Sequence, residues 1–311
     1  MIDDKSKVLF EYLLADARIS VKMLAKIIHS SEATVINRIK KLEKEGFISR
    51  YDAVINWQKI PFIKKVYFVK IDANNKEFEK SIINQKEVFS LIRLDGLYNY
   101  QVWCFFRTKK QLKEFNRLIK KYQYQEIEIN ELVFPKVTFF DVELNIPVKN
   151  IKKITLKLGK IDITIMKYMA QGHGRDSLYE ISKIIKIPYD SVHYHGKKLL
   201  NSDYFSAIIA QVGTNKFTLQ ITSLLLECSN KTNSEIMYNS LKQVRRVQSD
   251  AIGKENKILV HFLSQTHTEY RETLSKIMSI IPRTRIRNLL ISYWKDVIIN
   301  NRYPLEYFLN K

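Results

Sequence analysis

The stretch LAKIIHSSEATVINRIKKL, residues 24–42, decides the fold of this chain, because its pattern returns as ISKIIKIPYDSVHYHGKKL at residues 181–199. The shift between the two stretches is 181 − 24 = 157 residues. The same shift carries Gly96 onto Gly253, far outside the helical stretch. An offset that holds over such a span indicates a tandem duplication rather than a chance likeness between two helices.

The first part of each copy has the pattern of a small helical domain. In residues 4–46, apolar side chains recur at helical spacing and predict three short helices. Ser31 is expected to cap the third helix, and Gly46 supplies a stop signal after it. Residues 47–55 then change to a β-type composition, which predicts a wing. The order predicts a winged helix-turn-helix.

The second part of each copy alternates strands and helices. The predicted order is β-α-β-β-α-β, which is ferredoxin-like. In the strand over residues 98–107, Trp103 and Phe105 make the second face apolar as well, so we expect that face to meet another sheet. The expected strands are 66–71, 88–94, 98–107 and 127–134 in the first copy and 217–227, 243–250, 256–263 and 284–292 in the second, with helices at 76–84, 109–122, 233–241 and 267–280.

The fold class is therefore predicted to be α+β, with two copies of a winged helix-turn-helix followed by a ferredoxin-like domain. The expected winged helices span 1–58 and 155–212, and the expected ferredoxin-like domains span 62–145 and 215–311. The chain has 311 residues, which is enough for several such domains.

Charge points to a polyanionic partner. Lys and Arg total 52 against 32 Asp and Glu, which gives a net charge of +20 and makes nucleic acid the first candidate. The two cysteines, Cys104 and Cys228, are too few for a disulfide framework. No apolar run approaches the roughly 18 residues of a membrane helix, and the start lacks the pattern of a signal peptide. We expect a cytoplasmic protein with no membrane partner.

Sixteen residues of the first 55 resemble a known family, the leucine-responsive or Lrp/AsnC transcription regulators. They are Asp4, Leu9, Asp16, Ala17, Arg18, Ser20, Leu24, Ala25, Val35, Arg38, Ile39, Leu42, Gly46, Ile48, Tyr51 and Ala53. The resemblance implies a unit that pairs through its ferredoxin-like domain. Two units in one chain would then form an internal pseudo-dimer, and a further homodimer of chains is an alternative.

The third helix carries the predicted DNA contacts. If Val35, Ile39 and Leu42 face the core, a face with Asn37 and Lys40 points outward, where Asn can read adenine and Lys can bind guanine or phosphate. Arg18, Arg38 and Arg50 are expected as phosphate clamps, with an internal ion pair as the alternative for Arg38. The full predicted set is Arg18, Ser31, Ala33, Thr34, Asn37, Arg38, Lys40, Lys41, Lys44, Arg50, Lys197 and Lys198. The plain alternative is a solvated helix face.

The second helix-turn-helix departs from this chemistry. At the shifted positions Asn37 becomes Tyr194, Ala33 becomes Asp190, and Ile39 becomes Gly196, which costs about 1 kcal/mol in helix propensity. Lys197 and Lys198 persist, so this module either binds the DNA backbone without reading bases or is only structural. His193 and His195 lie on different sides of a helix, so no metal site is expected.

The resemblance also implies an effector site at the turn between two strands. The residues concerned are Gly96, Tyr98, Asn99, Gly253 and Asn256. Family members have an acidic residue where both copies here carry Asn, so a small-molecule effector such as an amino acid and the loss of ligand response are both open. No cofactor is expected.

Three functions compete. The first is a DNA-binding transcription regulator with internally paired units. The second is an enzyme similar to haem-pathway decarboxylases, against which stands the lack of a catalytic triad, phosphate loop or carboxylate pair in the sequence; we therefore expect no enzymatic activity. The third is an architectural protein that coats DNA with low specificity through its charge.

Overall fold

The computed structural model describes residues 2–59, 62–72, 75–133, 140, 142, 144, 157–213, 219–229, 236, 240–241, 244, 247–253, 256–280 and 286–299. They fall into two compact units. The winged-helix unit lies within Met1–Asn56 and Lys136–Thr218, and the barrel unit lies within Trp57–Pro135 and Leu219–Pro304. Each unit therefore joins like parts of the two copies. The four domain boundaries expected from the sequence stay predictions.

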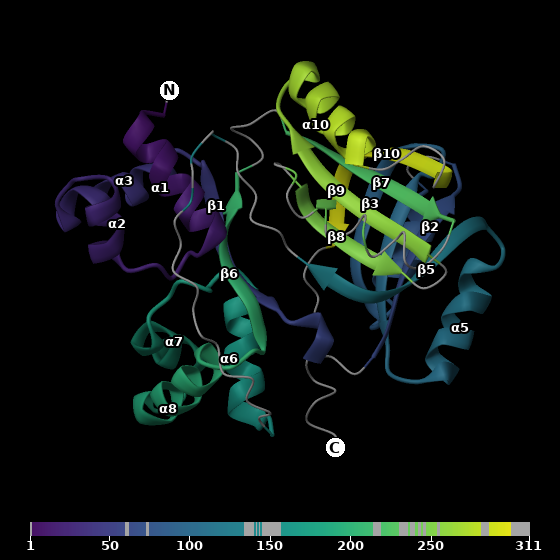
Figure 1. The fold of residues 1–311 in the computed structure, drawn as a ribbon. Helices are drawn as coiled ribbons and strands as arrows, with labels where there is room; N and C mark the ends of the chain where they lie inside the picture. Colours follow the sequence, from purple (N-terminus) through teal and green to yellow (C-terminus); the bar gives the residue numbers. More distant parts are fainter. Residues whose placement is uncertain are drawn as a thin grey trace. The chain divides into compact units, whose positions relative to one another are not determined.

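The winged-helix unit holds two modules with the same order of elements (Figure 1). The first consists of α1 (Asp4–Ala15), α2 (Val21–Ile27), α3 (Glu32–Lys44) and β1 (Ile48–Ile55), and the second of α6 (Lys160–Ala170), α7 (Leu178–Ile185), α8 (Tyr189–Leu200) and β6 (Phe205–Val212). The strand expected as a wing exists in both modules. It does not pair within its own module: β1 pairs antiparallel with β6, so the two modules share one two-stranded ribbon.

The register of this ribbon is nearly two-fold symmetric. Ile48 lies opposite Val212 and Ile55 opposite Phe205, and the 157-residue shift exchanges these two pairs. The shift maps Asp52 onto its own partner, Ile209, because 209 − 157 = 52, so this pair lies at the centre. Around that centre α1 packs on β6 while α6 packs on β1. Each module thus completes its core with the strand of the other.

Two matching hydrogen bonds reinforce this exchange. The Ala17 amide donates to the Ile208 carbonyl at 2.7 Å, and the Gly174 amide donates to the Tyr51 carbonyl at 2.7 Å. Both donors and both acceptors are equivalent under the shift, since 174 − 17 = 157 and 208 − 51 = 157. An unpaired buried amide is costly, so these bonds favour the paired arrangement.

The barrel unit contains both ferredoxin-like domains and confirms the predicted order in the first copy. After η1 (Trp57–Lys59), its elements are β2 (Ile63–Lys70), α4 (Lys76–Ile83), β3 (Val88–Gly96), β4 (Tyr100–Phe106), α5 (Lys109–Ile119) and β5 (Gln123–Val133), then β7 (Gln220–Cys228), β8 (Val247–Gly253), β9 (Lys257–Ser264), α10 (His267–Ile280) and β10 (Ile286–Ile299). The helix expected near 233–241 lies largely outside the described residues.

The sequence predicts that the two sheets pack face to face, but in the structure they are also joined by hydrogen-bonded strands. They form one closed barrel in the order β10-β3-β4-β2-β5-β8-β9-β7. The long strands β5 and β10 close it, because each pairs first with its own copy and then with the other: β5 with β2 and β8, β10 with β7 and β3. Closure leaves no exposed sheet edge at these seams.

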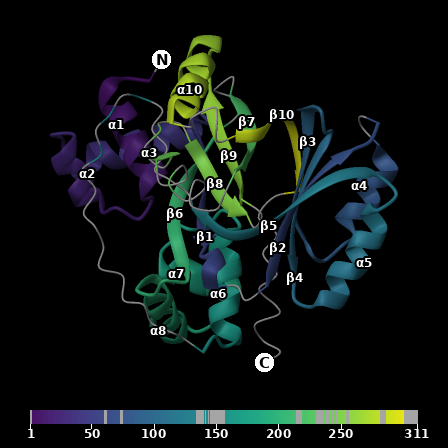
Figure 2. The same ribbon diagram turned by 45° about the vertical axis from the view of Figure 1, so that its right-hand side comes forward.

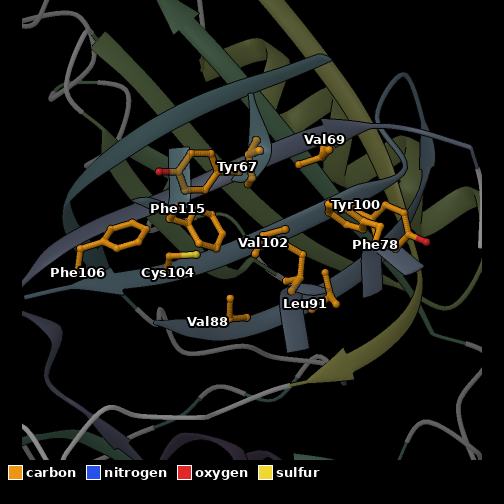
Figure 3. Close-up of a cluster of buried hydrophobic side chains, with 12 residues drawn as sticks. Tyr67, Val69, Phe78, Val88, Leu91, Tyr100, Val102, Cys104, Phe106 and Phe115 are labelled. Carbon is orange, nitrogen blue, oxygen red and sulfur yellow. The ribbon is translucent and has the colours of Figure 1, made fainter. Parts of the chain in front are cut away.

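The outer face of each sheet is covered by helices and the inner face fills the barrel. Figure 2 shows α4 and α5 along the first copy's strands and α10 along the second copy's. On the outer side of the first copy, Tyr67, Phe106 and Phe115 form part of one buried cluster (Figure 3). Inside the barrel, Trp103 and Phe105 are also buried. The prediction that both faces of this sheet are covered is confirmed.

The barrel interior also contains a polar contact between the copies. Ser223 donates to Gln101 Oε1 at 3.2 Å, the Gln101 amide nitrogen lies 3.1 Å from His261 Nε2, and the Trp294 indole donates to Ser223 at 2.7 Å. Gln101 comes from the first copy and the other three residues from the second. Bonded buried polar groups of this kind favour one register over its alternatives. Among the described residues, no helix has the length and hydrophobicity that crossing a membrane requires.

Candidate nucleic-acid interface

Helix α3 is built to bury one face and expose the other. Val35, Ile39 and Leu42 are buried, as the sequence predicts. Ser31 is the N-cap, because its hydroxyl accepts the Thr34 amide at 3.2 Å. Such a cap stabilises a helix by about 1 kcal/mol and fixes where it starts. The position of every outward side chain on α3 follows from this start.

The outward face of α3 is polar and cationic. Asn37, Lys40 and Lys44 are exposed, and among the described residues none forms a hydrogen bond or ion pair with their side chains. Lys41 is also exposed and lies 3.8 Å from Glu45 one turn later. Ala33 is exposed beside Asn37, so a base could approach the amide closely. An amide and several ammonium groups on one open helix face can bind base edges and phosphates.

The turn before α3 has the same backbone in both modules. His29 has φ 51° and Lys186 has φ 55°, and 186 − 29 = 157. The amide that follows bonds back into the preceding helix in both cases, Ser30 to Ala25 at 3.0 Å and Ile187 to Ser182 at 3.2 Å. In the first module Lys5 Nζ further donates to the His29 carbonyl at 3.2 Å. Both turns thus hold the second and third helices in a helix-turn-helix.

A hollow of about 590 Å³ lies beside this turn in the first module. It is lined by Lys22, Ala25, Lys26, His29, Ser30, Ser31 and Glu32. Lys22 and Lys26 are exposed and four residues apart, so both ammonium groups lie on one side of α2. Cations next to a helix N-terminus suit an anion such as a phosphate. The sequence reasoning missed these lysines, although their spacing and their place before the turn could have indicated them.

Arg38 forms the internal ion pair that was its alternative role. Its Nη1 lies 2.6 and 2.5 Å from the two Asp3 carboxylate oxygens and 2.8 Å from Ser6 Oγ. The hydrogen bond from Arg38, followed by the Ser6 amide, lowers the pKa of Asp3 well below its usual range. Asp3 is also the N-cap of α1. Arg38 therefore fixes α3 against α1 rather than reaching outward.

Arg18 also has an internal role, which corrects its expected use as a phosphate clamp. Its Nη1 donates to the carbonyls of Gly174 at 2.9 Å and Asp176 at 3.2 Å, both in the second module. Burial lowers the pKa of this guanidinium, against a partly opposing effect of Asp16. Arg50 differs, since its side chain is half exposed while Nε lies 3.1 Å from Asp52.

The glycine in α8 does not leave a gap in the core of the second module. A Cβ placed on Gly196 would lie 2.4 Å from Leu178 Cδ2, so the leucine fills the space that Ile39 fills in the first module. The position of Leu178 in the first module is Val21, because 178 − 157 = 21. The pair Val21 and Ile39 thus corresponds to Leu178 and Gly196, and Leu178 keeps the core of the second module packed at this point.

The two histidines of α8 have separate partners. His195 Nδ1 lies 2.8 Å from Asp162 on α6, at the position equivalent to Arg38. The His193 ring lies 5.3 Å from that of Tyr189. In the part of the chain that the structure describes, no group of three or more His, Cys, Asp or Glu could hold a metal ion. Lys197 is exposed, and Lys198 lies 6.0 Å from the Tyr194 ring.

The expected effector residues of the first copy have structural contacts. Gly96 has φ 151°, and a Cβ there would lie 3.0 Å from the Ile291 carbonyl of the paired strand β10. Asn99 Oδ1 accepts the Ile71 amide at 3.1 Å. Tyr98 is buried against Phe68, with ring centroids 6.0 Å apart.

The second copy repeats the glycine arrangement. Gly253 pairs with Ile129 of β5, as Gly96 pairs with Ser292 of β10. Asn256 adopts φ 60°. At Gly96 the lack of a Cβ allows the long strand β10 of the other copy to approach closely, which is a structural reason for the residue type. Effector binding at these turns stays a prediction.

Known proteins match this chain in two ways. A family model for winged helix-turn-helix DNA-binding domains matches residues 2–49. An uncharacterised HTH-type transcriptional regulator of Pyrococcus furiosus is 30% identical over 117 residues, which cover 37% of this chain and 78% of that protein. The HTH-type transcriptional regulator LrpA of Pyrococcus abyssi is 37% identical over 62 residues, 20% of this chain and 44% of that protein.

The second likeness is to a solved structure and extends over both copies. The crystal structure of the siroheme decarboxylase NirDL superposes with a TM-score of 0.59 at 10% sequence identity, covering 98% of this chain and 97% of that chain. At this identity the match shows a shared fold. The duplicated architecture therefore has a counterpart of nearly the same extent.

Proposed function

This chain belongs to the Lrp/AsnC family of winged helix-turn-helix transcription regulators, and from that premise we propose that it binds double-stranded DNA by placing α3 in the major groove. This proposal rests on the exposed face of α3, where Asn37, Lys40 and Lys44 lie opposite the buried face of the helix. In this role the Asn37 amide reads an adenine edge, and Lys40 and Lys44 bind guanine or phosphate.

The remaining contacts position the helix. Ser31, Thr34 and Lys41 surround the start and outer edge of α3, and Arg50 keeps a half-exposed side chain on β1. Hydroxyl and cationic groups at the border of a recognition helix bind phosphates, which orient the protein without reading sequence. Lys22 and Lys26 on α2 extend this phosphate surface across the hollow beside the turn.

The test is a selection of bound duplexes from a random pool, followed by affinity measurements with variants. Asn37→Ala should relax the preference at one base position at a cost of roughly 1–3 kcal/mol, while Lys41→Ala should weaken all sequences alike and reduce the salt slope by about 1. Lys110→Ala on α5, an exposed lysine of the barrel unit, is the matched control. Equal effects of Asn37→Ala and Lys41→Ala on all sequences would contradict base reading by α3.

Competition with random DNA separates this function from architectural coating. A regulator should hold its selected site about a thousandfold or more tightly than random duplex at fixed salt. Coating through the charge of +20 would give no enriched motif and a steep salt dependence only.

The internal pair supplies both DNA-binding modules from one polypeptide. The shared β1–β6 ribbon and the closed barrel each join the two copies. We therefore expect a monomeric chain to occupy two half-sites, whereas a homodimer of chains would be required if the second module were silent. Mass in solution measured together with footprint length distinguishes these arrangements, and a monomer that protects a single short half-site would contradict the internal pair.

An amino-acid effector is the remaining proposed partner. Asn99 and Asn256 carry no charge to bind an ammonium group, and Asn99 already bonds to Ile71. We expect weak binding at most, and a thermal-shift series with the twenty amino acids measures it.

Decarboxylation of a tetrapyrrole acid is the second candidate function. The observation that favours it is the fold shared with a siroheme decarboxylase over nearly the whole chain. Its test is the absorption spectrum of purified protein mixed with a tetrapyrrole carboxylic acid. A saturable spectral change together with loss of carboxyl groups would replace the regulator proposal, while an unchanged spectrum leaves only DNA binding.

A further inference from the structure

The second module presents tyrosines where the first presents polar side chains. The shift of 157 carries Lys22 onto Tyr179, Glu32 onto Tyr189 and Asn37 onto Tyr194. The replacements fall on the second and third helices of the module, α7 and α8. These three positions face outward in both modules.

These tyrosines are exposed to an unusual degree. Tyr194 is 64% exposed, Tyr179 54% and Tyr189 44%, and none is needed to fill the module's core. Tyr179 and Tyr189 contact one another edge to face, with ring centroids 5.9 Å apart. Large exposed apolar groups that lie together mark a binding surface more often than a solvated one.

The charges around the tyrosines indicate the class of partner. Lys183 Nζ lies 4.3 Å from the Tyr179 ring and Lys198 Nζ lies 6.0 Å from the Tyr194 ring. Lys186 in the turn and Lys197 on α8 are exposed as well. Two ammonium groups beside aromatic rings, with two more exposed on the same helix-turn-helix, suit a polyanionic partner that also offers apolar groups. Duplex DNA has this chemistry, through its phosphates and the thymine methyl groups of the major groove.

The placement of α8 strengthens this assignment. The ribbon of β1 and β6 relates the two modules by a near two-fold, so the outward face of α8 is the counterpart of the outward face of α3. The close contact of Gly196 with Leu178 keeps α8 packed on α7. The second module is therefore an intact helix-turn-helix whose exposed face has a different composition.

Resting on the function proposed above, we propose that α8 also enters the major groove and reads thymine methyl groups with Tyr194, so that the chain recognises an asymmetric operator. The C5-methyl of thymine is the apolar group that the major groove offers, and aromatic carbons can cover it. Asp190, one turn before Tyr194 and exposed, suits the cytosine amino group, which is a donor. The half-site under α3 offers purine edges to Asn and Lys, and the half-site under α8 offers pyrimidine groups.

Replacement of thymine by uracil tests this directly, because it removes only the methyl group. Full-length protein is used with the duplex enriched from the random pool. Uracil in the half-site assigned to α8 should weaken binding about fourfold for each methyl that Tyr194 covers, the effect of about one buried carbon. Tyr194→Ala should abolish this sensitivity, and Tyr194→Phe should retain it. Uracil in the other half-site should have an effect that Tyr194→Ala leaves unchanged.

The outcomes separate this inference from the function beneath it. An enriched site that is a perfect inverted repeat, or a uracil effect that persists in Tyr194→Ala, overturns the asymmetric operator while DNA binding stands. If Asn37→Ala rather than Tyr194→Ala removes the uracil sensitivity, the methyl contact belongs to α3 and not to α8. That result also overturns the asymmetric operator. The lack of any enriched duplex contradicts the regulator itself. Since Tyr194 is largely exposed, its variants are expected to melt with the wild-type protein, which circular dichroism checks.

Discussion

Single residues at the start of α1 connect folding to pH. The Asp3 carboxylate caps α1 and accepts two contacts from Arg38, which lowers its pKa. A carboxyl group with a lowered folded pKa stabilises the protein above its unfolded value of about 4, and this stability is lost as the pH falls below it. The start of α1 and its contact with α3 through Arg38 should therefore loosen in acid.

We predict that Asp3→Asn lowers the free energy of unfolding at pH 7 and flattens its decline between about pH 5 and pH 2. The carboxylate is more than half exposed, so solvent screening limits the loss to about 1 kcal/mol. Urea unfolding across this pH range is the measurement. Asp4→Asn, which removes an almost fully exposed partner of Lys7, is the matched control, and an equal effect from both variants would mean that the Arg38 contact contributes nothing.

Gly196 and Leu178 should show opposite effects alone and together. Helix propensity favours Gly196→Ala by about 1 kcal/mol, but the new Cβ would lie 2.4 Å from Leu178 Cδ2, and overpacking of this kind costs about 1–3 kcal/mol. We expect Gly196→Ala to destabilise the wild-type protein and to stabilise the Leu178→Val variant. A double-mutant cycle measures this coupling, and additive changes would show that the two residues do not compete for space.

Some residues of the site have a recognisable pattern in the sequence and others do not. Val35, Ile39 and Leu42 could be assigned to the core because their spacing alone reveals the buried face. Arg18 could not be assigned, since its partners are carbonyls of Gly174 and Asp176 that the fold brings from more than 150 residues away. Backbone carbonyls have no signature in the sequence. An arginine that binds DNA phosphate and an arginine that binds carbonyls of its own chain therefore cannot be told apart from the sequence.

At the scale of elements, one arginine joins a helix and two strands of the barrel. Arg93 on β3 binds Glu79 of α4 through two contacts of 2.7 Å, and its Nη1 lies 2.7 Å from Asp296 on β10. Tyr100 donates a further hydrogen bond to Glu79 at 2.8 Å. The hydrogen bonds from Arg93, ahead of the Tyr100 contact, lower the pKa of Glu79.

We predict that Arg93→Ala costs roughly 2 to 3 kcal/mol, because it leaves a nearly buried carboxylate with one partner less. Asp296→Asn should cost under about 1 kcal/mol, since Asp296 is half exposed. Chemical denaturation monitored by tryptophan fluorescence, which reports on the barrel residues Trp103 and Trp294, compares the variants. A smaller loss in Arg93→Ala than in Asp296→Asn would contradict this assignment.

Elements with strong local patterns were predictable, and pairings between copies were not. The expected helix at 267–280 coincides with α10 (His267–Ile280), because its apolar period and its flanks are local signals. The shared ribbon of β1 and β6 and the closing seams of the barrel depend on contacts between copies. Alternating side chains tell which face is covered but not which strand pairs at the edge, so the sequence indicated two sheets and left their closure open.

At the scale of the whole molecule, the shared ribbon should fix the spacing of the operator. Both modules complete their cores with each other's strand, so α3 and α8 cannot separate without exposing apolar surface. We predict that inserting about 5 base pairs between the half-sites lowers affinity to that of a single half-site, and that inserting about 10 does not restore it, since the face of the duplex is recovered but the distance is not. Gel-shift titration of the three duplexes checks this. Undiminished binding to the 10-pair insertion would show that the modules move independently.

The centre of the ribbon shows what joining the copies permits. In an assembly of two identical chains, a residue on the two-fold axis always meets itself, so an aspartate there would have to face another aspartate. Here Asp52 is buried opposite Ile209, a combination that no pair of identical chains could place at that point. Because the two halves are encoded separately within one chain, a mutation in one half does not change the other. The two halves can therefore diverge in sequence while remaining joined.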